Sequence, residues 1–301
     1  MLKYIKNSKG SVVIIVAAAM VVMLGFAALV IDVGAWYNGR VQLSNLADAA
    51  ALAGAQDLPD TAAAEGTARV YAAISPPGHA GDVITVDAQT DHITVDATRV
   101  APSYFARVLG INNVTITAHA RVNRGVAGSA RSVVPLGYVA DPDQPFPLTK
   151  GVEYPITLEA GEGTKGNYLL LDFPVNPINI VPGPIYSSAG GDFMNYIMYG
   201  YGGTIQVNSY VWSNTGLKVG QVSPAINYRV GDTVIVPVIT KMSFDASTGK
   251  SEYLTWGFAA FQVTGYSGKT VKGKFLEFNT SDAGPGGNPA NLGLSYMRLV
   301  E

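Results

Sequence analysis

The stretch DVGAWYNGRVQLSNLADAAALAGA, residues 32 to 55, decides how this chain begins to fold. It is rich in alanine and glycine, contains no proline, and carries few charges. Alanine has the highest helix propensity of all residues, and leucine and glutamine follow it closely, so the stretch predicts a helix. Because its side chains are small, another helix backbone can approach it closely. The question is therefore what packs against it.

An uncharged apolar run comes directly before this stretch. No residue between Lys9 and Asp32 is charged, and SVVIIVAAAMVVMLGFAALVI, residues 11–31, is about as long as one helix needs to cross a bilayer. Basic residues precede the run, at Lys3, Lys6 and Lys9. By the positive-inside rule we expect residues 1–10 in the cytoplasm and everything after Asp32 outside. Lys9 and Asp32 then mark the two membrane boundaries.

The predicted helix does not end at the membrane, because the first proline of the chain is Pro59. We predict one helix from Ser11 to about Asp57. Its outer half places small residues on one stripe, which we interpret as a helix-assembly stripe: Ala47, Ala50, Ala51, Gly54 and Ala55. Two alternatives stay open, since the stripe can pack on the protein's own next helix or on a neighbouring subunit.

The same region carries a specific resemblance to a known family. An apolar helix followed by Asp-Val-Gly, an aromatic pair, Arg, Gln-Leu and an alanine-rich end resembles the N-terminal signature of TadE/TadG-like proteins. Those proteins are membrane-anchored, pilin-like components associated with Flp (tight adherence) pili. The matching positions are Asp32, Val33, Gly34, Trp36, Tyr37, Arg40, Gln42, Leu43, Ala47, Asp48, Ala49, Ala50, Ala51, Leu52, Ala53, Gly54 and Ala55.

A second motif extends the resemblance to roughly the first 125 residues. SYFARVLGINNVTITAHARV, residues 103–122, is similar to the family's Phe-Ala-Arg-x-Leu-Gly-Ile helix followed by an alternating strand. Family members often carry a proline inside the membrane helix, whereas this chain has Val21 and its neighbours there. The resemblance therefore implies a straighter membrane helix than is usual in the family.

The fate of the N-terminus has two further alternatives. One is a cleaved secretory signal, although the apolar run is long for that purpose. The other is a prepilin-type leader, in which a peptidase cuts after Gly10 and leaves Ser11 at the head of the helix. Many pilins carry Glu at the fifth mature position, and Ile15 stands there in this chain.

A small β-β-α-β module is predicted to follow the long helix. Thr61 to Ile74 is typical of a second helix, ended by two prolines. Alternating apolar and polar residues predict strands at 83–88 and 92–99, joined by a tight turn, and a third strand at 114–122. Between the second and third strands, PSYFARVLG predicts a short helix that Gly110 caps.

The remainder of the chain is predicted to be a separate domain rich in strands. We place a flexible linker at residues 125–132, GVAGSARS, and a β-rich domain at 133–301. Apolar runs between Gly, Pro and Asn clusters favour a β-sandwich or an open barrel. The domain also resembles the C-terminal region of some Gram-positive relatives of the family, at Pro135-Leu136-Gly137, Gly166 through Asp172 and Gly257 through Phe261. The expected fold class is thus α+β.

The sequence contains no pattern typical of a catalytic or cofactor site. There is no cysteine, which excludes disulfides and thiolate metal sites. The three histidines do not share ligand spacing, and GYSGKT at 265–270 lacks the first glycine of a phosphate-binding loop. Weak calcium candidates are Asp141 and Asp143, for which a solvated loop is the competing interpretation. For Asp32 the simplest interpretation is a residue that ends the apolar span. The alternative is a residue that caps or pairs at the membrane surface, or across subunits if helices bundle.

These observations predict a non-enzymatic structural protein with no cofactor. The net charge of −2 argues against a nucleic-acid partner, and no small-molecule substrate is expected. The resemblance implies a pilin-like subunit or a membrane-anchored assembly component of a Tad/Flp-type system. Its expected partners are the membrane, other copies of itself and other pilus-assembly proteins, with the bulk of the chain outside the cell or in an extracellular filament. The alternative is a tethered adhesin whose β-domain binds glycan, a surface or calcium through the exposed aromatics Trp212, Tyr199 and Tyr201.

Overall fold

The computed structural model describes residues 9–74, 81–141, 143, 146, 149, 152–159, 165–173, 193–215, 222–247 and 249–300, with side chains from residue 12 onward. The chain forms two compact units. Unit 1 comprises Met1–Val122 and Leu299–Glu301, and unit 2 comprises Asn123–Arg298. In place of the flexible linker expected at 125–132, the structure has the end of one strand and a second short strand, both in unit 2.

Unit 1 is built on one long helix, α1 (Lys9–Ala55), which runs without a break and ends two residues before the predicted end at about Asp57. A second helix, α2 (Thr61–Ala73), begins where the Asp60 side chain accepts a hydrogen bond from the backbone N–H of Ala63 over 3.1 Å. This is an N-cap, which satisfies one of the free N–H groups of the first turn. The α2 face formed by Ala64, Ala68 and Ala72 is buried.

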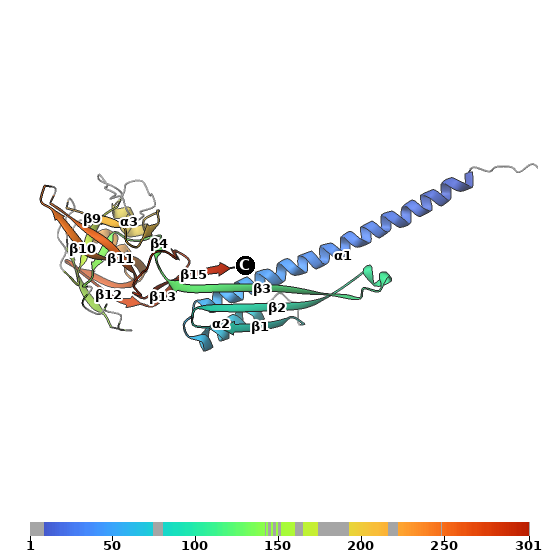
Figure 1. Ribbon diagram of the computed structural model, residues 1–301, viewed down its shortest axis with the longest axis horizontal. Coiled ribbons are helices and arrows are strands. Elements are labelled where there is room, and N and C mark those ends of the chain that lie inside the picture. The colour runs from blue at the N-terminus through green and yellow to red at the C-terminus, as the bar shows by residue number, and fades with distance from the viewer. Residues whose placement is uncertain are drawn as a thin grey trace, which may run out of the picture. The chain divides into compact units, whose positions relative to one another are not determined.

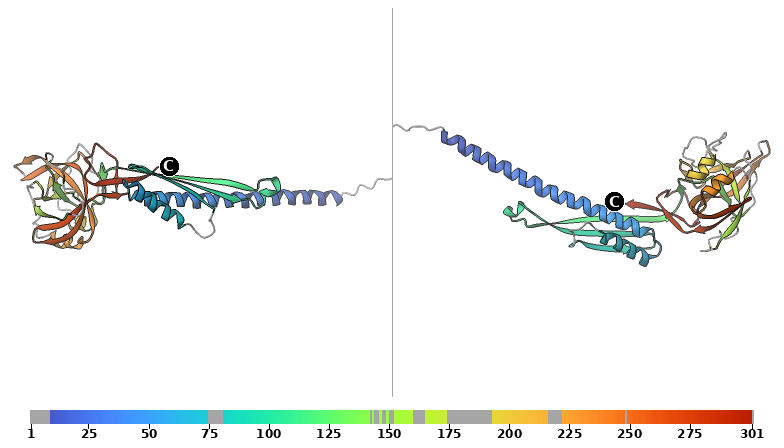
Figure 2. Two further views of the ribbon diagram at one scale, coloured as in Figure 1. Left: turned by 90° about the horizontal axis from the view of Figure 1, so that it is seen from below. Right: turned by 180° about the vertical axis from the view of Figure 1, so that it is seen from behind.

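The strands of unit 1 lie beside the second half of α1, as Figures 1 and 2 show. They are β1 (Val83–Ala88), β2 (His92–Pro102) and β3 (Asn113–Val126), with the short 3₁₀ helix η1 (Ala106–Leu109) between the last two. The β1–β2 pair is antiparallel, from Val83 opposite Thr98 to Ala88 opposite Ile93. The predicted β-β-α-β order is therefore present, with a 3₁₀ turn as its helix and Gly110 capping it at a φ of 85°.

Unit 2 is rich in strands, as predicted. Its strands are β4 (Ser129–Ala130), β5 (Leu136–Val139), β6 (Tyr154–Glu159), β7 (Tyr168–Asp172), β8 (Ile205–Gln206), β9 (Tyr210–Ser213), β10 (Thr233–Asp245), β11 (Lys250–Ser267), β12 (Thr270–Leu276), β13 (Phe278–Thr280), β14 (Ala283–Gly284) and β15 (Leu294–Val300), the last two residues of which belong to unit 1. The helices α3 (Phe193–Tyr199) and α4 (Ser223–Tyr228) were not predicted, because each is too short to show helical periodicity.

Six of these strands close into a ring. The pairings run β10–β5–β7–β6–β12–β11, and β11 pairs back onto β10. β9 is not one of these six strands, but it pairs with two of them, β7 and β11. The two expected alternatives, sandwich or open barrel, thus resolve toward a small barrel whose ring is closed among the described strands. A closed ring leaves few unpaired strand edges.

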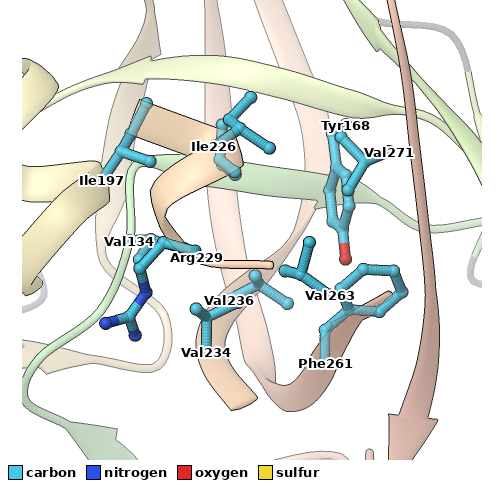
Figure 3. Close-up of a pocket in the computed structure, with 11 residues that line it drawn as sticks. Val134, Tyr168, Ile197, Ile226, Arg229, Val234, Val236, Phe261, Val263 and Val271 are labelled. Atoms are coloured by element: carbon cyan, nitrogen blue, oxygen red, sulfur yellow. The ribbon is translucent and has the colours of Figure 1, made fainter. Parts of the chain in front are cut away.

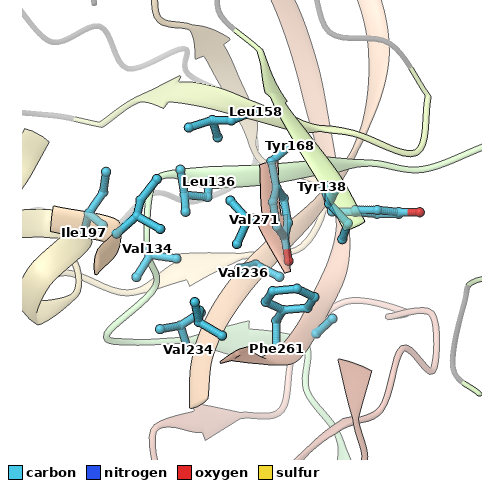
Figure 4. Packing of buried hydrophobic residues seen from close by; sticks show 14 of the residues in the cluster. Val134, Leu136, Tyr138, Leu158, Tyr168, Ile197, Val234, Val236, Phe261 and Val271 are labelled. Carbon is cyan, nitrogen blue, oxygen red and sulfur yellow. The ribbon is translucent and has the colours of Figure 1, made fainter. Parts of the chain in front are cut away.

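The interior of the ring is filled by large apolar and aromatic side chains. Tyr168, Phe261 and Val236 point into the same space from three different strands (Figure 4). The rings of Tyr168 and Phe261 meet edge to face with their centroids 5.3 Å apart. Such pairs add about 0.5–1.5 kcal/mol beyond the area they bury. Unit 2 therefore has its own packed core.

Candidate functional site

The outer half of α1 is held against α2 and β2 by very close backbone packing. A Cβ added at Gly54 would lie 2.6 Å from the carbonyl oxygen of Ala64 and 2.6 Å from Cδ1 of Ile93. Only a glycine fits at this crossing. Farther down the helix, the Gln42 side chain contacts Arg99 of β2, and Gly39 lies close to Ile116 of β3. The β2–β3 hairpin therefore runs back along α1 toward its apolar half.

The small-residue stripe is buried inside unit 1. Ala47, Ala50, Ala51 and Ala55 have no exposed surface, and Leu43 beside them is equally buried. Because α2 and β2 already cover the stripe, it packs on the protein's own elements in this chain. Association of α1 with a neighbouring subunit must then use other residues of the helix.

Asp32 has a role that sequence reasoning did not favour. Its carboxylate is buried and accepts hydrogen bonds from the backbone N–H groups of Tyr104, Phe105 and Ala106, at N···O distances between 2.6 and 3.3 Å. These three residues lead into η1. Asp32 thus does more than end the apolar span, because it fastens the far end of the β2–β3 hairpin to α1.

The electrostatics of Asp32 follow from these donors. Burial opposes ionisation of the carboxyl group, but the N–H groups of Ala106, Tyr104 and Phe105, with the nearby charge of Arg107, outweigh it. The pKa of Asp32 therefore lies below its ordinary value of 3.8. The side chain is ionised at neutral pH and acts as a charged acceptor, which makes the stronger kind of hydrogen bond.

The segment fastened by Asp32 exposes apolar side chains. Val108 is 89% exposed and Leu109 is 80% exposed. We define the apolar tip as the five exposed apolar residues of this turn: Tyr104, Phe105, Val108, Leu109 and Ile111. Soluble surfaces rarely keep so many apolar side chains together, so the tip is a candidate contact surface.

The apolar half of α1 is also uncovered. From Val12 to Ile31 every side chain is exposed apart from the half-buried Ala28. The helix is long and apolar enough to cross a membrane. Lys3 and Lys6, and the side chains of Lys9 and Ser11, lie outside the described part of unit 1. The expected inner boundary and the cleavage position after Gly10 therefore stay predictions.

A surface groove of about 480 Å³ lies between α1 and the end of β2. Its wall contains a buried ion pair, in which the Arg99 guanidinium donates to both oxygens of Asp82 at 2.7 and 2.8 Å. Arg99 also donates to Gln42 across the groove at 3.2 Å. This network joins β2 to α1 a few turns of helix from Asp32. Each of its three side chains has a partner within the network.

In unit 2 the cavity that the described residues enclose inside the barrel is too small for a ligand. The cavity is about 10 Å³, enough for about one water molecule. Ile197 of α3 and Ile226 of α4 line it together with Phe261 and Val263 of β11 (Figure 3). The barrel is therefore a packed core around this cavity.

The calcium and aromatic candidates lie in unit 2, and the described residues show their surroundings. Asp141 is paired with Lys165 at 2.9 Å and accepts the backbone N–H of Asp143, and the pair with Lys165 lowers the pKa of Asp141. Among the described residues no group of three acidic or histidine side chains is placed to hold a metal. Tyr201, expected in an exposed groove, is completely buried in the core against Phe173 and Tyr196.

The other two aromatic candidates, Tyr199 and Trp212, are more exposed than Tyr201. Tyr199 is exposed and stacks on Tyr228 with ring centroids 5.7 Å apart, while Trp212 of β9 is half-buried. His92 and His119 each pair with a different aspartate, and His79 lies outside the described residues. GYSGKT forms the turn between β11 and β12, with Gly268 at a φ of 64°.

Comparison with known proteins places one segment of the chain in a family. Residues 10–57, which span α1, match the family described as putative Flp pilus-assembly TadE/G-like. No curated protein and no solved structure matches the chain. The chain thus carries a TadE/G-like N-terminal helix, which suggests a role in Tad pilus assembly and association with the membrane.

Proposed function

We propose that this chain is a non-enzymatic, membrane-anchored structural component of a Tad/Flp-type pilus system. Residues 11–31 of α1 span the membrane, the basic N-terminus lies in the cytoplasm, and both units lie outside. One observation carries the proposal: a single unbroken helix is exposed and apolar along its first half, whereas one face of its second half is buried within unit 1.

The packing of α1 covers one surface through which copies of a filament subunit could associate. A conventional pilin-like filament needs a helix surface on which neighbouring copies pack closely, and small residues are the natural contact for that purpose. In this chain the small-residue stripe is already covered by α2 and β2. The exposed half of α1 is instead suited to lipid, because no charged residue interrupts it between Lys9 and Asp32.

A topology experiment tests the proposal. The native chain has no cysteine, so single cysteines report without background. Asn7→Cys lies before the span, and Ser247→Cys lies in the exposed turn that joins β10 to β11. On intact cells, a membrane-impermeant maleimide should label Ser247→Cys and leave Asn7→Cys unlabelled until the membrane is opened.

The same experiment has clear contrary results. Labelling of both positions on intact cells would show that the N-terminus is outside, which contradicts the anchor. Release of the Ser247→Cys protein by alkaline carbonate would show that no segment spans the bilayer. Each outcome is read on the full-length protein, with the cysteine-free parent as the blank.

A further inference from the structure

We propose that the apolar tip inserts into the lipid interface of the membrane beside α1, so that unit 1 contacts the membrane at two points. This inference rests on the proposed membrane anchor. The partner of the apolar tip is the lipid itself, at the boundary between headgroups and acyl chains. The first observation is chemical: the tip carries two aromatic and three aliphatic side chains, all exposed, within a stretch of eight residues (104–111).

The second observation fixes the height of the tip. Asp32 is the first charged residue after the apolar span, and the amides of Tyr104, Phe105 and Ala106 are bonded directly to its carboxylate. The helix rises only about 1.5 Å per residue, so Asp32 and the last apolar residue, Ile31, lie at nearly the same level. The tip is therefore held at the level where the bilayer begins.

The third observation concerns direction. Contacts from Gly54 with Ile93, from Gln42 with Arg99, and from Asp32 with Tyr104 show that β2 descends along α1 toward the apolar half. In Figure 1 the turn between β2 and β3, which contains η1, lies at the end of the hairpin that points along α1 toward its apolar half. It is the part of unit 1 that meets the lipid surface first.

The composition of the tip suits the interface better than the hydrocarbon centre. Tyrosine and other aromatic residues gather where headgroups meet acyl chains, and Arg107, which lies between the tip residues Phe105 and Val108 in sequence, provides a cation for headgroup phosphates. Apolar groups at such sites reach about 5–10 Å into the boundary. A second contact of this kind would restrict tilting of unit 1 about the single membrane helix.

The test uses the full chain with one cysteine at a time, each labelled with the polarity-sensitive fluorophore NBD. The protein is reconstituted in phosphatidylcholine–phosphatidylglycerol vesicles with or without bromine on the acyl chains. Leu109→Cys reports on the tip, Met20→Cys on the span, and Thr90→Cys, in the exposed turn at the opposite end of β2, is the matched control. The proposal predicts blue-shifted emission and bromine quenching for Leu109→Cys and neither effect for Thr90→Cys.

Other results would overturn the proposal in distinguishable ways. Quenching at Met20→Cys without quenching at Leu109→Cys would leave the anchor intact and refute insertion of the tip. Blue-shifted emission at Leu109→Cys that brominated lipid does not quench would show that protein, such as a second copy, covers the tip. Absence of quenching at Met20→Cys would refute the anchor, and the tip proposal would fall with it.

A second variant tests the positioning role of Asp32. In the Leu109→Cys background, Asp32→Asn replaces an acceptor oxygen with an NH₂ group that cannot accept from the backbone amides. We expect bromine quenching at Leu109 to fall while quenching of Met20→Cys carrying the same change stays constant. Unchanged quenching at Leu109 would show that the hydrogen bonds do not hold the tip at the membrane.

Discussion

Asp32 Oδ2 accepts a hydrogen bond from the backbone N–H of Ala106 over 2.6 Å, and this contact joins residues 74 positions apart in the chain. Asp32 belongs to the TadE/G-like segment, and Ala106 belongs to the second motif at residues 103–122. The two motifs therefore meet at the end of the apolar span, in addition to the close approach of Gly39 and Ile116 farther along α1. The role of Asp32 is therefore to hold the second motif against α1.

The first prediction concerns this connection. Asp32→Asn should increase hydrogen exchange at the amides of Tyr104, Phe105 and Ala106 and lower the melting temperature of unit 1, because the three amides lose their charged acceptor. Exchange is measured residue by residue in detergent or nanodiscs. Protection of these amides equal to that of the parent would contradict the assignment.

The second prediction concerns pH. The pKa of Asp32 is lowered in the folded chain, so its stabilising contribution is fully present above the ordinary value of 3.8 and is lost as pH falls below it. The melting temperatures of the parent and Asp32→Asn should therefore differ at about pH 7 and converge toward about pH 2. A difference that is the same at both pH values would show that ionisation of Asp32 is irrelevant.

The third prediction concerns the helix crossing at Gly54. Gly54→Ala should destabilise unit 1 by about 1–3 kcal/mol, because the new methyl group meets the Ala64 carbonyl oxygen at 2.6 Å. The matched control is Gly34→Ala on the same helix, where nothing lies within 4 Å. There the better helix propensity of alanine should stabilise by up to about 1 kcal/mol. Equal effects of the two changes, measured by hydrogen exchange, would refute the packing.

The fourth prediction concerns the buried ion pair. Asp82→Asn should destabilise unit 1 by about 3 kcal/mol, because the guanidinium of Arg99 stays buried with its carboxylate partner removed. Glu65→Gln is the control, since Glu65 pairs with Arg69 on the exposed face of α2 and should cost under about 0.5 kcal/mol. A cost as small as that of the control would mean that the Arg99–Asp82 pair is open to water.

The sequence predicted the elements of unit 1 well because their signals are local. Alanine content and the position of Pro59 set the extent of α1, and alternation marked β1, β2 and β3. The partners of Asp32 could not be predicted, because they are backbone amides, which carry no sequence signal. A hint lay in the joint presence of the two motifs, which both belong to one resemblance.

Unit 2 shows the same limit in another form. Short apolar runs predicted its strands, but which strand pairs with which depends on contacts far apart in the chain, such as β5 with β10. Tyr201 shows how this limit affects the prediction of binding-site residues. An aromatic residue between glycines is typical of a surface loop, and only the packing of Phe173 and Tyr196 around it shows that it belongs to the core.

The central claim, that the chain stays in the membrane as an anchored pilus-system component, is tested most directly by shearing. Cells are sheared, released filaments are pelleted, and both fractions are imaged by electron microscopy with an antibody to unit 2. The account predicts bare filaments and label on the cell membranes, with Met1 still present on the protein. Continuous label along the filaments, on a protein that begins at Ser11, would contradict it and identify the chain as the filament subunit.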